Sequence, residues 1–275
     1  MASPHWDESR AQASRDFNFH FREKSLAGKC VVVAGGTGGL GAATVALLAN
    51  EGAHVIVGYR SDRERAARLS RAIETHYGVK IALVEGDICN ADARRQYVDS
   101  AHRLKAPLVG AAIFPGDPAR VPLADLNREA LVASLEANYV GPLLLAKELG
   151  EAMEASPDGG SLVLLATMQA VAAFPSSLNY AAPKAALVHA ARVLAQQWNH
   201  VRVNVVAPGA TIAGMAAASV KSGKYDRHIS SGAISRFGHP EDVARAVRFF
   251  LEPDNYVTGQ VLVVDGGLTL RRDRG

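Results

Sequence analysis

Short apolar runs alternate with longer amphipathic stretches along residues 30–264. Each run holds five to seven residues, mostly valine, isoleucine, leucine and alanine, which is typical of buried strands. The predicted strands cover residues 30–34, 54–58, 80–85, 107–113, 161–166, 202–207 and 260–264. The predicted helices cover residues 42–50, 63–77, 91–104, 128–155, 183–198 and 240–251.

Strands that alternate with helices pair in parallel, and the crossover helices cover both faces of the sheet. The pattern therefore predicts an α/β fold, a doubly wound three-layer sandwich around a seven-stranded parallel sheet. We expect residues 28–275 to form one domain because no linker separates a second. Residues 211–238, rich in Ala, Ser and Gly, contain no predicted element and are interpreted as a mobile lid beside the site.

Residues 1–27 show no sustained apolar period until a cluster of phenylalanines near their end. We predict an N-terminal arm that is disordered at first and then docks on the domain. Phe17, Phe19 and Phe21 alternate with other residues, as in a short strand or a contact with another subunit.

Charge and cysteine content narrow the function classes. The 30 basic and 27 acidic residues give a net charge of +3, and the basic run at residues 271–274 is interpreted as a solvated terminus, which argues against nucleic-acid binding. The only cysteines, Cys30 and Cys89, form neither a disulfide framework nor a metal-ligand spacing with the histidines. No apolar stretch approaches the ~20 residues of a membrane helix, and the first 25 residues lack a secretory signal. We therefore predict a cytoplasmic protein with no membrane partner.

A glycine cluster lies between the first predicted strand and the first predicted helix. The cluster fits two registers, Gly36-x-Gly38-x-x-Gly41 and Gly35-x-x-x-Gly39-x-Gly41, and both stay open at this point. A turn of this kind lets the backbone approach a pyrophosphate and points the amides of the helix N-terminus at its charge. The predicted dinucleotide contacts in the turn are Gly35, Thr37, Gly38, Gly39, Leu40 and Gly41.

The end of the second predicted strand indicates which dinucleotide binds. An acidic side chain there would hold the adenosine 2′-hydroxyl and repel a 2′-phosphate. The chain instead reads Tyr59-Arg60-Ser61, with no carboxylate before Asp62. Arg60 can pair with a phosphate and Ser61 can add a hydroxyl, so the sequence favours NADP over NAD.

Three residues that follow the fifth predicted strand have a shared chemical logic. Tyr180 and Lys184 lie four residues apart on what should be the opening turns of a helix, and Thr167 lies thirteen residues earlier. A phenol with a pKa near ~10 is a weak acid–base catalyst at neutral pH, and a neighbouring ammonium stabilises its phenolate. Pro183 is tolerated only in a first helical turn, which fits a helix that begins there.

With these motifs in place, residues 27–270 resemble the short-chain dehydrogenase/reductase family, particularly its β-ketoacyl-carrier-protein reductases. The resemblance rests on the order and spacing of several motifs together: Gly35, Gly39 and Gly41; Asp87-Ile88; Asn138; Tyr180-x-x-x-Lys184; residues 204–209; and residues 264–267.

The resemblance implies a Rossmann fold and assigns four catalytic roles. Tyr180 would be the acid–base residue, and Lys184 would hold the nicotinamide ribose and lower the pKa of the tyrosine. Thr167 stands in the usual position of a serine whose hydroxyl binds the substrate oxygen. Asn138 would support a water-linked proton path to Lys184.

The resemblance also implies further cofactor contacts. Asp87 and Ile88 would flank the adenine, and the remaining predicted contacts are Ala111, Pro208, Gly209 and Thr211. The chain departs from the family where residues 110–113 read Gly-Ala-Ala-Ile in place of Asn-Asn-Ala-Gly, and where Thr211 precedes the usual threonine position at Ala213.

The sequence therefore predicts an NADP-dependent oxidoreductase that moves a hydride between nicotinamide and a carbonyl or alcohol carbon of a small molecule. The family implies a homotetramer or homodimer. Two alternatives remain open: a non-catalytic NADP-binding sensor or scaffold, motivated by the altered residues 110–113, and an isomerase or dehydratase that recycles bound NADP.

Overall fold

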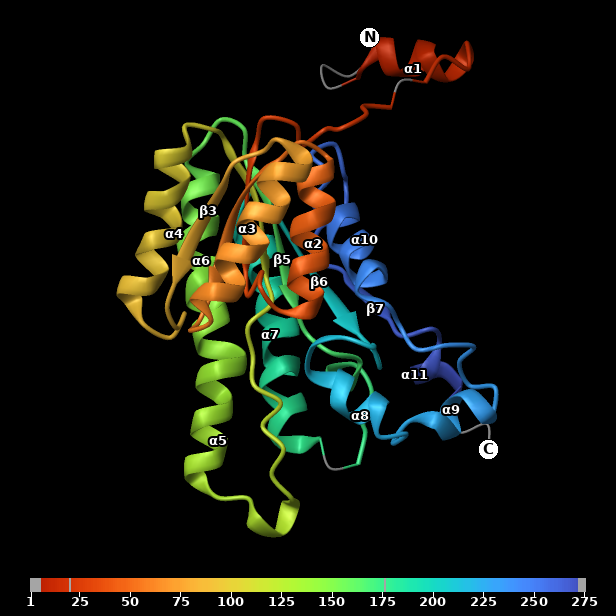
Figure 1. Ribbon diagram of the computed structural model, residues 1–275. Helices are drawn as coiled ribbons and strands as arrows, with labels where there is room; N and C mark the ends of the chain where they lie inside the picture. Colours follow the sequence, from red (N-terminus) through yellow and green to blue (C-terminus); the bar gives the residue numbers. More distant parts are fainter. Residues whose placement is uncertain (1–5, 20, 176, 272–275) are drawn as a thin grey trace.

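One parallel sheet of seven strands forms the centre of the computed structural model, which describes residues 6–19, 21–175 and 177–271 (Figure 1). The strand order is β3-β2-β1-β4-β5-β6-β7, so the predicted doubly wound sheet is confirmed. The strands are β1 (Cys30–Ala34), β2 (His54–Tyr59), β3 (Ile81–Glu85), β4 (Leu108–Ile113), β5 (Gly160–Leu165), β6 (Val201–Pro208) and β7 (Val261–Val264). Residues 272–274 of the predicted solvated terminus lie outside the described residues.

Helices connect the strands and cover both faces of the sheet. They are α1 (Glu8–Arg15), α2 (Gly39–Asn50), α3 (Arg63–Tyr77), α4 (Ala91–Leu104), α5 (Arg128–Leu135), α6 (Gly141–Glu154), α7 (Leu178–Gln197), α8 (Ala217–Lys221), α9 (Asp226–Ser230), α10 (Pro240–Leu251) and α11 (Leu268–Arg271). Short turns of other helical types are η1 (Leu123–Asp125), η2 (Glu136–Val140), η3 (Met168–Ala170) and η4 (Gly214–Ala216).

The core has two layers because side chains alternate across each strand. In β1, Val32 faces one layer with Leu145 of α6 and Leu187 of α7, and Val33 faces the other with Leu48 of α2 and Phe250 of α10. All six side chains are fully buried or nearly so. The carboxyl ends of the parallel strands consequently meet at one edge, where the loops are free to build a site.

The segment between β4 and β5 is one long helix with a local irregularity. The prediction of a helix over residues 128–155 is confirmed, except that Glu136–Val140 forms a π-helical turn between α5 and α6. The Gly141 amide bonds back to the Glu136 carbonyl across this turn. A π-turn inside an α-helix commonly marks a functional position, and Asn138 lies in this one.

Helix α7 begins at Leu178, five residues before the predicted start, so Pro183 lies in its second turn and the predicted first-turn placement is wrong. Proline has no N–H and therefore leaves the carbonyl four residues earlier, that of Asn179, without its helical partner. The Ser134 hydroxyl of α5 donates to this Asn179 carbonyl. A bond from a neighbouring helix thus compensates for the proline.

The N-terminal arm departs from the prediction. Residues 8–15 were expected to be disordered and instead form α1, because the Asp7 carboxylate caps the Arg10 amide at 3.0 Å and Arg15 pairs with Glu8 at 2.8 Å. Helix α1 buries no residue and lies apart from the sheet (Figure 1). Phe17, Phe19 and Phe21 are exposed and in no strand within the described residues. Ser25 and Leu26 contact the domain: the Ser25 hydroxyl donates to the Glu252 carboxylate at 3.0 Å, and Leu26 is fully buried.

Residues 211–238 contain short helices where none was predicted, namely η4, α8 and α9. The two ends of the segment meet. The Ile212 amide donates to the Gly238 carbonyl at 2.9 Å, and the Gly238 amide donates to the Ala210 carbonyl at 2.9 Å. The segment is therefore a loop closed at its base, and the mobility of this predicted lid stays a prediction.

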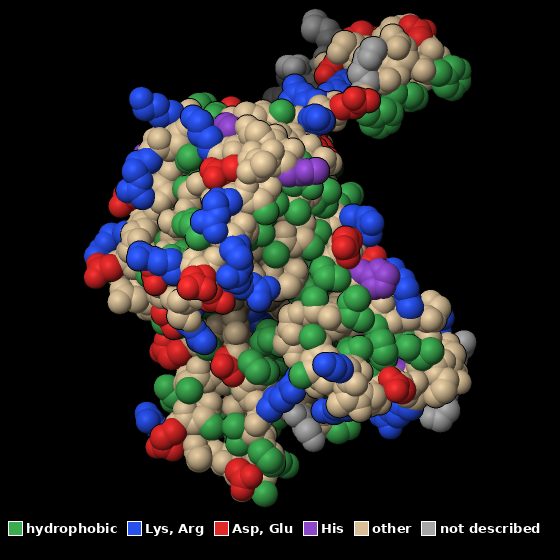
Figure 2. Space-filling model, viewed as in Figure 1, with side chains coloured by type: hydrophobic (Ala, Val, Ile, Leu, Met, Phe, Trp, Pro, Cys, Tyr) green, Lys and Arg blue, Asp and Glu red, His purple; other side chains and the backbone are tan. Residues whose placement is uncertain are grey.

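Basic and acidic side chains intermingle over α3 and α4 on the face that Figure 2 shows. None of the helices in the described residues combines the length and apolar character needed to span a bilayer. Within the same residues, no three His, Cys, Asp or Glu side chains gather in a way that could hold a metal ion.

Candidate active site

Two cavities open at the carboxyl ends of the strands. The larger, about 690 Å³, lies between the ends of β4, β5 and β6 and the 211–238 segment. The smaller, about 170 Å³, lies beyond the ends of β2 and β3. The predicted site residues that line the larger cavity are Leu40, Thr167, Tyr180, Lys184, Pro208, Gly209 and Thr211. Those that line the smaller are Gly35, Tyr59, Arg60, Asp87 and Ile88.

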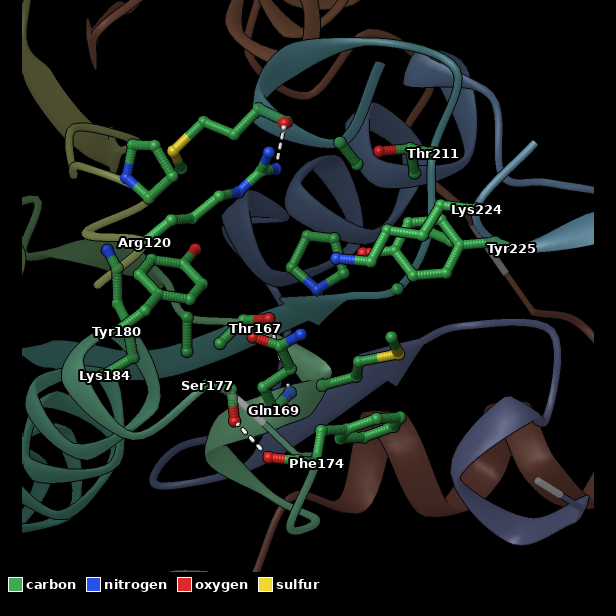
Figure 3. A pocket seen from close by; sticks show the side chains of 18 of the residues that line it. Arg120, Thr167, Gln169, Phe174, Ser177, Tyr180, Lys184, Thr211, Lys224 and Tyr225 are labelled. Atoms are coloured by element: carbon green, nitrogen blue, oxygen red, sulfur yellow. Dashed lines mark hydrogen bonds between the residues drawn. The ribbon is translucent and has the colours of Figure 1, made fainter. Parts of the chain in front are cut away.

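Tyr180 and Thr167 face the larger cavity from two different elements (Figure 3). Tyr180 is in the first turn of α7, and Thr167 follows β5 and caps η3 by accepting a bond from the Gln169 amide at 3.3 Å. The Thr167 hydroxyl lies close enough to the Tyr180 phenol to lower its pKa. Two hydroxyls thus converge on one point in the cavity, where both can bind one substrate oxygen.

Burial raises the pKa of Tyr180 to about 12. The Thr167 hydroxyl and the positive charge of Arg120 act in the opposite direction. Arg120 lies on the loop after β4 and was not identified from the sequence. Arg120 therefore acts on the phenol from a distant segment of the chain.

Lys184 is fully buried one helical turn beyond Tyr180. Its ammonium donates to the Leu165 carbonyl at 2.9 Å and to the Pro115 carbonyl at 3.2 Å, at the ends of β5 and β4. Burial lowers the pKa of Lys184 to about 7, because the charged form is poorly solvated there. Two carbonyls at the sheet edge therefore fix the position of this side chain.

The depressed pKa of Lys184 predicts that the ligand-free protein becomes more stable as the pH rises. Between pH 7 and 10.5 the unfolded chain holds a proton on this lysine that the folded chain has released, so raising the pH favours the folded state. One pKa unit corresponds to about 1.4 kcal/mol, and the gain should reach a few kcal/mol. Urea unfolding of the wild-type protein and Lys184→Met at several pH values measures it, and a difference between them that does not change with pH contradicts the prediction.

Asn138 is fully buried in the π-turn η2 and holds the loop after β4. Its Oδ1 accepts from the Asp117 amide at 3.0 Å, and its Nδ2 donates to the Asp117 carbonyl at 3.0 Å and to the Ser134 hydroxyl at 3.2 Å. A Cβ added at Gly116 would lie 2.7 Å from Asn138 Oδ1 and 3.0 Å from Lys184 Nζ. The amide and the ammonium therefore both lie next to the space that a side chain at residue 116 would occupy.

The glycine turn has the stereochemistry of the register Gly35-x-x-x-Gly39-x-Gly41. Gly35 has a φ of +74°, which favours glycine. A Cβ at Gly39 would lie 2.8 Å from the Ala213 Cβ of the lid, and one at Gly41 would lie 2.3 Å from the Gly35 carbonyl oxygen. Gly38 has room for a Cβ and serves as the N-cap of α2. Gly36 of the first register is crowded as well, because a Cβ there would lie 2.9 Å from the Val33 carbonyl oxygen. The second register is the one in which space or a left-handed φ requires glycine at every position.

Basic side chains gather where β2 ends. The Arg65 Nε donates to the Thr37 carbonyl of the glycine turn at 2.7 Å. Arg60 and Ser61, earlier in the sequence at the end of β2, are exposed. Two acidic side chains lie near this end of the sheet: Glu85 of β3 accepts from the Tyr59 hydroxyl at 3.1 Å and pairs with Arg63 at 3.3 Å, and Asp87 lines the smaller cavity together with Arg60. The Glu85 carboxylate is thus engaged, whereas no ion pair among the described residues involves Arg60.

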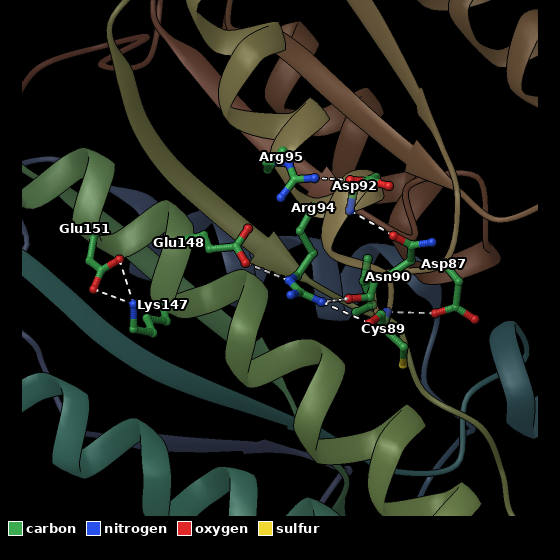
Figure 4. A network of polar contacts seen from close by, with 10 residues as sticks. Asp87, Cys89, Asn90, Asp92, Arg94, Arg95, Lys147, Glu148 and Glu151 are labelled. Atoms are coloured by element: carbon green, nitrogen blue, oxygen red, sulfur yellow. Dashed lines mark hydrogen bonds and ion pairs between the residues drawn. The ribbon is translucent and has the colours of Figure 1, made fainter.

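A buried arginine positions the turn that carries Asp87 and Ile88 (Figure 4). Arg94 of α4 donates Nη1 to the Ile88 carbonyl at 2.8 Å and to the Cys89 carbonyl at 3.1 Å. Its Nε donates to the Glu148 carboxylate of α6 at 2.7 Å. Asp87 accepts from the Cys89 amide at 2.9 Å, and this exposed residue lines the smaller cavity.

Two of the predicted cofactor contacts, Ala111 and Thr211, have surroundings unlike those of the other predicted contacts. Ala111 is fully buried in the middle of β4 and lines neither cavity, whereas Phe114 and Pro115, just beyond that strand, do line them. The Thr211 hydroxyl lines the larger cavity but donates to the Ala213 carbonyl at 3.2 Å.

Two features fit a dinucleotide that would extend across both cavities. The glycine turn and the first turn of α2 present backbone amides with no acidic side chain in that turn, which suits a pyrophosphate. Gly35 and Leu40, at the two ends of this turn, line the smaller and the larger cavity respectively. The sequence indicated the glycines, but Arg65, Arg94 and Arg120 carried no signal because their contacts come from distant segments.

Comparison with known proteins gives a consistent result. A family described as Enoyl-(Acyl carrier protein) reductase matches residues 34–269. An uncharacterized oxidoreductase of Methylorubrum extorquens is 30% identical over 256 residues, covering 88% of this chain and 98% of that protein.

Solved structures of similar chains share the fold. The structure of a short-chain type dehydrogenase/reductase from Mycobacterium ulcerans matches with a TM-score of 0.83 and 27% identity, covering 89% of this chain and 91% of that one. The NADPH-dependent 3-quinuclidinone reductase from Rhodotorula rubra matches with a TM-score of 0.78 and 25% identity, covering 90% and 94%. With its two cavities, its Tyr–Lys pair one helical turn apart and these matches, the chain belongs to the short-chain dehydrogenase/reductase family of oxidoreductases.

Proposed function

We propose that the protein is an NADP-dependent oxidoreductase that transfers a hydride between nicotinamide and a carbonyl or alcohol carbon of a small molecule. The observation that carries the proposal is the convergence of Tyr180, Thr167 and Lys184 on one cavity at the carboxyl edge of the sheet. Since the three residues come from α7 and the end of β5, the fold itself brings them together.

The residues of the chain supply binding and proton transfer, and the nicotinamide supplies the hydride or takes it up. Thr167 and Tyr180 bind the substrate oxygen between their hydroxyls. Because the pKa of Tyr180 is about 12, the phenol keeps its proton at neutral pH and can donate it to the oxygen of a carbonyl that is being reduced. Lys184, held by two carbonyls, is placed to bind ribose hydroxyls next to the tyrosine.

The adenosine end supports NADP over NAD. Arg60 lines the smaller cavity, Arg65 reaches the glycine turn, and Glu85 is engaged by Tyr59 and Arg63. A 2′-phosphate would meet positive charge there. The NADPH-dependent reductase of Rhodotorula rubra gives a precedent among the similar structures.

Arg60→Ala is expected to weaken NADPH binding by at least about tenfold, because a charge-assisted hydrogen bond is worth about 1.5–3 kcal/mol. NADH binding should change by less than about twofold, since NADH lacks the 2′-phosphate. Fluorescence titration with both nucleotides measures this, with Arg71→Ala, an exposed arginine further along α3, as the matched control. An equal loss for NADH and NADPH would assign Arg60 to a site other than the 2′-phosphate.

The experiment that tests the activity is a panel of ketones, aldehydes, acyl thioesters and sugars, assayed with NADPH and with NADH. Oxidation of NADPH that depends on a carbonyl compound supports the proposal. Tight NADPH binding without turnover on any class would favour a sensor or scaffold, and conversion without net change in NADPH absorbance would favour an isomerase or dehydratase. The presence of Thr167, Tyr180 and Lys184 together at the cavity does not support the hypothesis of a non-catalytic sensor.

We also propose that the protein is a cytoplasmic homotetramer or homodimer that binds neither nucleic acid nor a membrane. Residues 28–275 would form its domain and residues 1–27 an arm. Three side chains on α5 support subunit pairing, because Leu131, Val132 and Leu135 are each more than 40% exposed. Sedimentation at several protein concentrations measures the assembly.

A further inference from the structure

The wall of the larger cavity is basic. Besides Lys184, its lining contains Arg120, Lys224, Arg227 and His228, and the lining contains no Asp or Glu. The pKa of His228 lies below its usual value because of burial and the nearby Arg227, so the imidazole is neutral at pH 7. Arg120, Lys224 and Arg227 therefore supply positive charge to the cavity that the proposed hydride transfer does not require.

These cations come from two segments that are far apart in the sequence. Arg120 lies on the loop between β4 and α5, and Lys224 and Arg227 lie around α9 in the 211–238 segment. Figure 3 shows Arg120 and Lys224 entering the cavity from opposite sides, with Tyr180 below Arg120 and Thr167 lower in the view between the two cations. No ion pair among the described residues involves any of the three, although Arg236 and Arg245, later in the chain, share Asp242.

The position of Arg120 is fixed by its surroundings. The preceding residue, Ala119, has a left-handed φ of +44°. Its amide donates to the Asp117 carboxylate at 2.7 Å, and its carbonyl accepts from Asn179 Nδ2 at 3.2 Å. The Asp117 backbone is in turn held by two hydrogen bonds with the side-chain amide of Asn138. A loop built in this way presents the guanidinium in one place, next to the hydroxyl of the reacting tyrosine.

Arg120 also joins the two walls of the cavity. Its Nη2 donates to the Met215 carbonyl of η4 at 3.0 Å. Because a guanidinium has five N–H donors, this bond uses only one of them. On the opposite wall, Lys224 Nζ lies 5.7 Å from the ring centroid of Tyr225, which stacks on His228 with centroids 6.2 Å apart. Both cations are thus positioned by neighbours and keep donors for a ligand.

We propose that the substrate is a small carbonyl or alcohol compound that bears an anionic group, a carboxylate or a phosphate, bound between Arg120 and Lys224 while its reacting oxygen lies at Tyr180 and Thr167. The inference rests on the proposed oxidoreductase function and names its substrate class. Arg227, which also lines the cavity, adds to the attraction for the anionic group. Arginine suits such an anion because its planar fork matches two oxygens at once.

The cofactor phosphates do not account for this charge. The 2′-phosphate is expected at Arg60, which lines only the smaller cavity, and the pyrophosphate at the glycine turn, which extends from Gly35 at the smaller cavity to Leu40 at the larger one. Arg120 and Lys224 line only the larger cavity, which also contains Tyr180 and Thr167. Loss of NADPH affinity in Arg120→Gln or Lys224→Gln, without loss of discrimination between substrates, would assign the cations to the cofactor and overturn the inference.

The test compares substrates that differ only in charge. An oxo acid and its methyl ester are assayed with NADPH, and the wild-type enzyme should show a kcat/KM at least about tenfold higher for the acid. Arg120→Gln and Lys224→Gln should each reduce this acid-to-ester ratio by about fivefold or more. Lys221→Gln, an exposed lysine at the end of α8 that lies outside the cavity lining, should keep the wild-type ratio. A wild-type ratio near one, or an equal fall in all three variants, overturns the inference.

A second measurement does not depend on turnover. Succinate and inorganic phosphate should raise the melting temperature of the NADPH-bound enzyme, and dimethyl succinate should not. The rise should vanish in the Arg120→Gln/Lys224→Gln double variant, and the stronger of the two anions tells a carboxylate site from a phosphate site. Reduction of neutral ketones with no anion preference refutes this inference and leaves the proposed function standing. Anion binding without reduction of any carbonyl compound does the reverse.

Discussion

Tyr180→Phe is expected to lower kcat by about 10³-fold, because the variant loses the proton donor for the substrate oxygen and general acid catalysis contributes about 10²–10⁴-fold. The phenyl ring stays in place, so the fold and the cavity shape are kept. NADPH affinity should change by less than about twofold, since the tyrosine hydroxyl contributes to proton transfer more than to cofactor binding. Steady-state kinetics and a nucleotide titration on the same preparation separate these two effects.

Tyr139→Phe is the matched control. Tyr139 is half-buried in the π-turn next to Asn138 and lines neither cavity, so removing its hydroxyl tests the cost of a Tyr→Phe change near the site without touching the reaction. Its kcat should stay within about threefold of the wild-type value. Wild-type turnover in Tyr180→Phe would contradict the assignment of the proton donor.

Gly41→Ala is expected to abolish dinucleotide binding and to destabilise the fold by about 2–4 kcal/mol. An added Cβ would lie 2.3 Å from the Gly35 carbonyl oxygen and 2.9 Å from the Gly36 Cα, and both contacts are with backbone that cannot rotate away. The start of α2 must then move, and the amides that face the pyrophosphate move with it. Thermal unfolding and NADPH titration measure the two losses.

Gly38→Ala distinguishes this steric effect from a general intolerance of the turn. At Gly38 the nearest atom to an added Cβ is the Gly35 carbonyl oxygen at 3.4 Å, an ordinary contact, and its φ of −70° suits any residue. The variant should keep its stability within about 1 kcal/mol. If Gly38→Ala were as damaging as Gly41→Ala, the register Gly35-x-x-x-Gly39-x-Gly41 would not be the one that matters.

The strands, most helices and the placement of the proposed catalytic pair could be predicted from the sequence because their signals are local. A run such as Cys30 to Ala34 is buried on both faces and so must be apolar throughout. Asp62 is a residue type that favours the N-cap position, and α3 begins at the next residue. The Tyr180 to Lys184 spacing is one helical turn and survives the error in the predicted start of α7. The sequence therefore determined the sheet, its order of elements and the side of the sheet that carries the chemistry.

Only the tertiary structure decided which residues act on these groups. Arg120 and Tyr180 are 60 positions apart, and nothing near Arg120 in the sequence indicates that Asn138 and Asn179 hold its loop beside the phenol. The same holds for Arg94, whose partner Glu148 is on another helix, and for Gly39, whose small size is required by Ala213 of the lid. Periodicity reports whether a side chain faces the core or the solvent, whereas the charge and contacts around a reacting group depend on which distant loops fold against it.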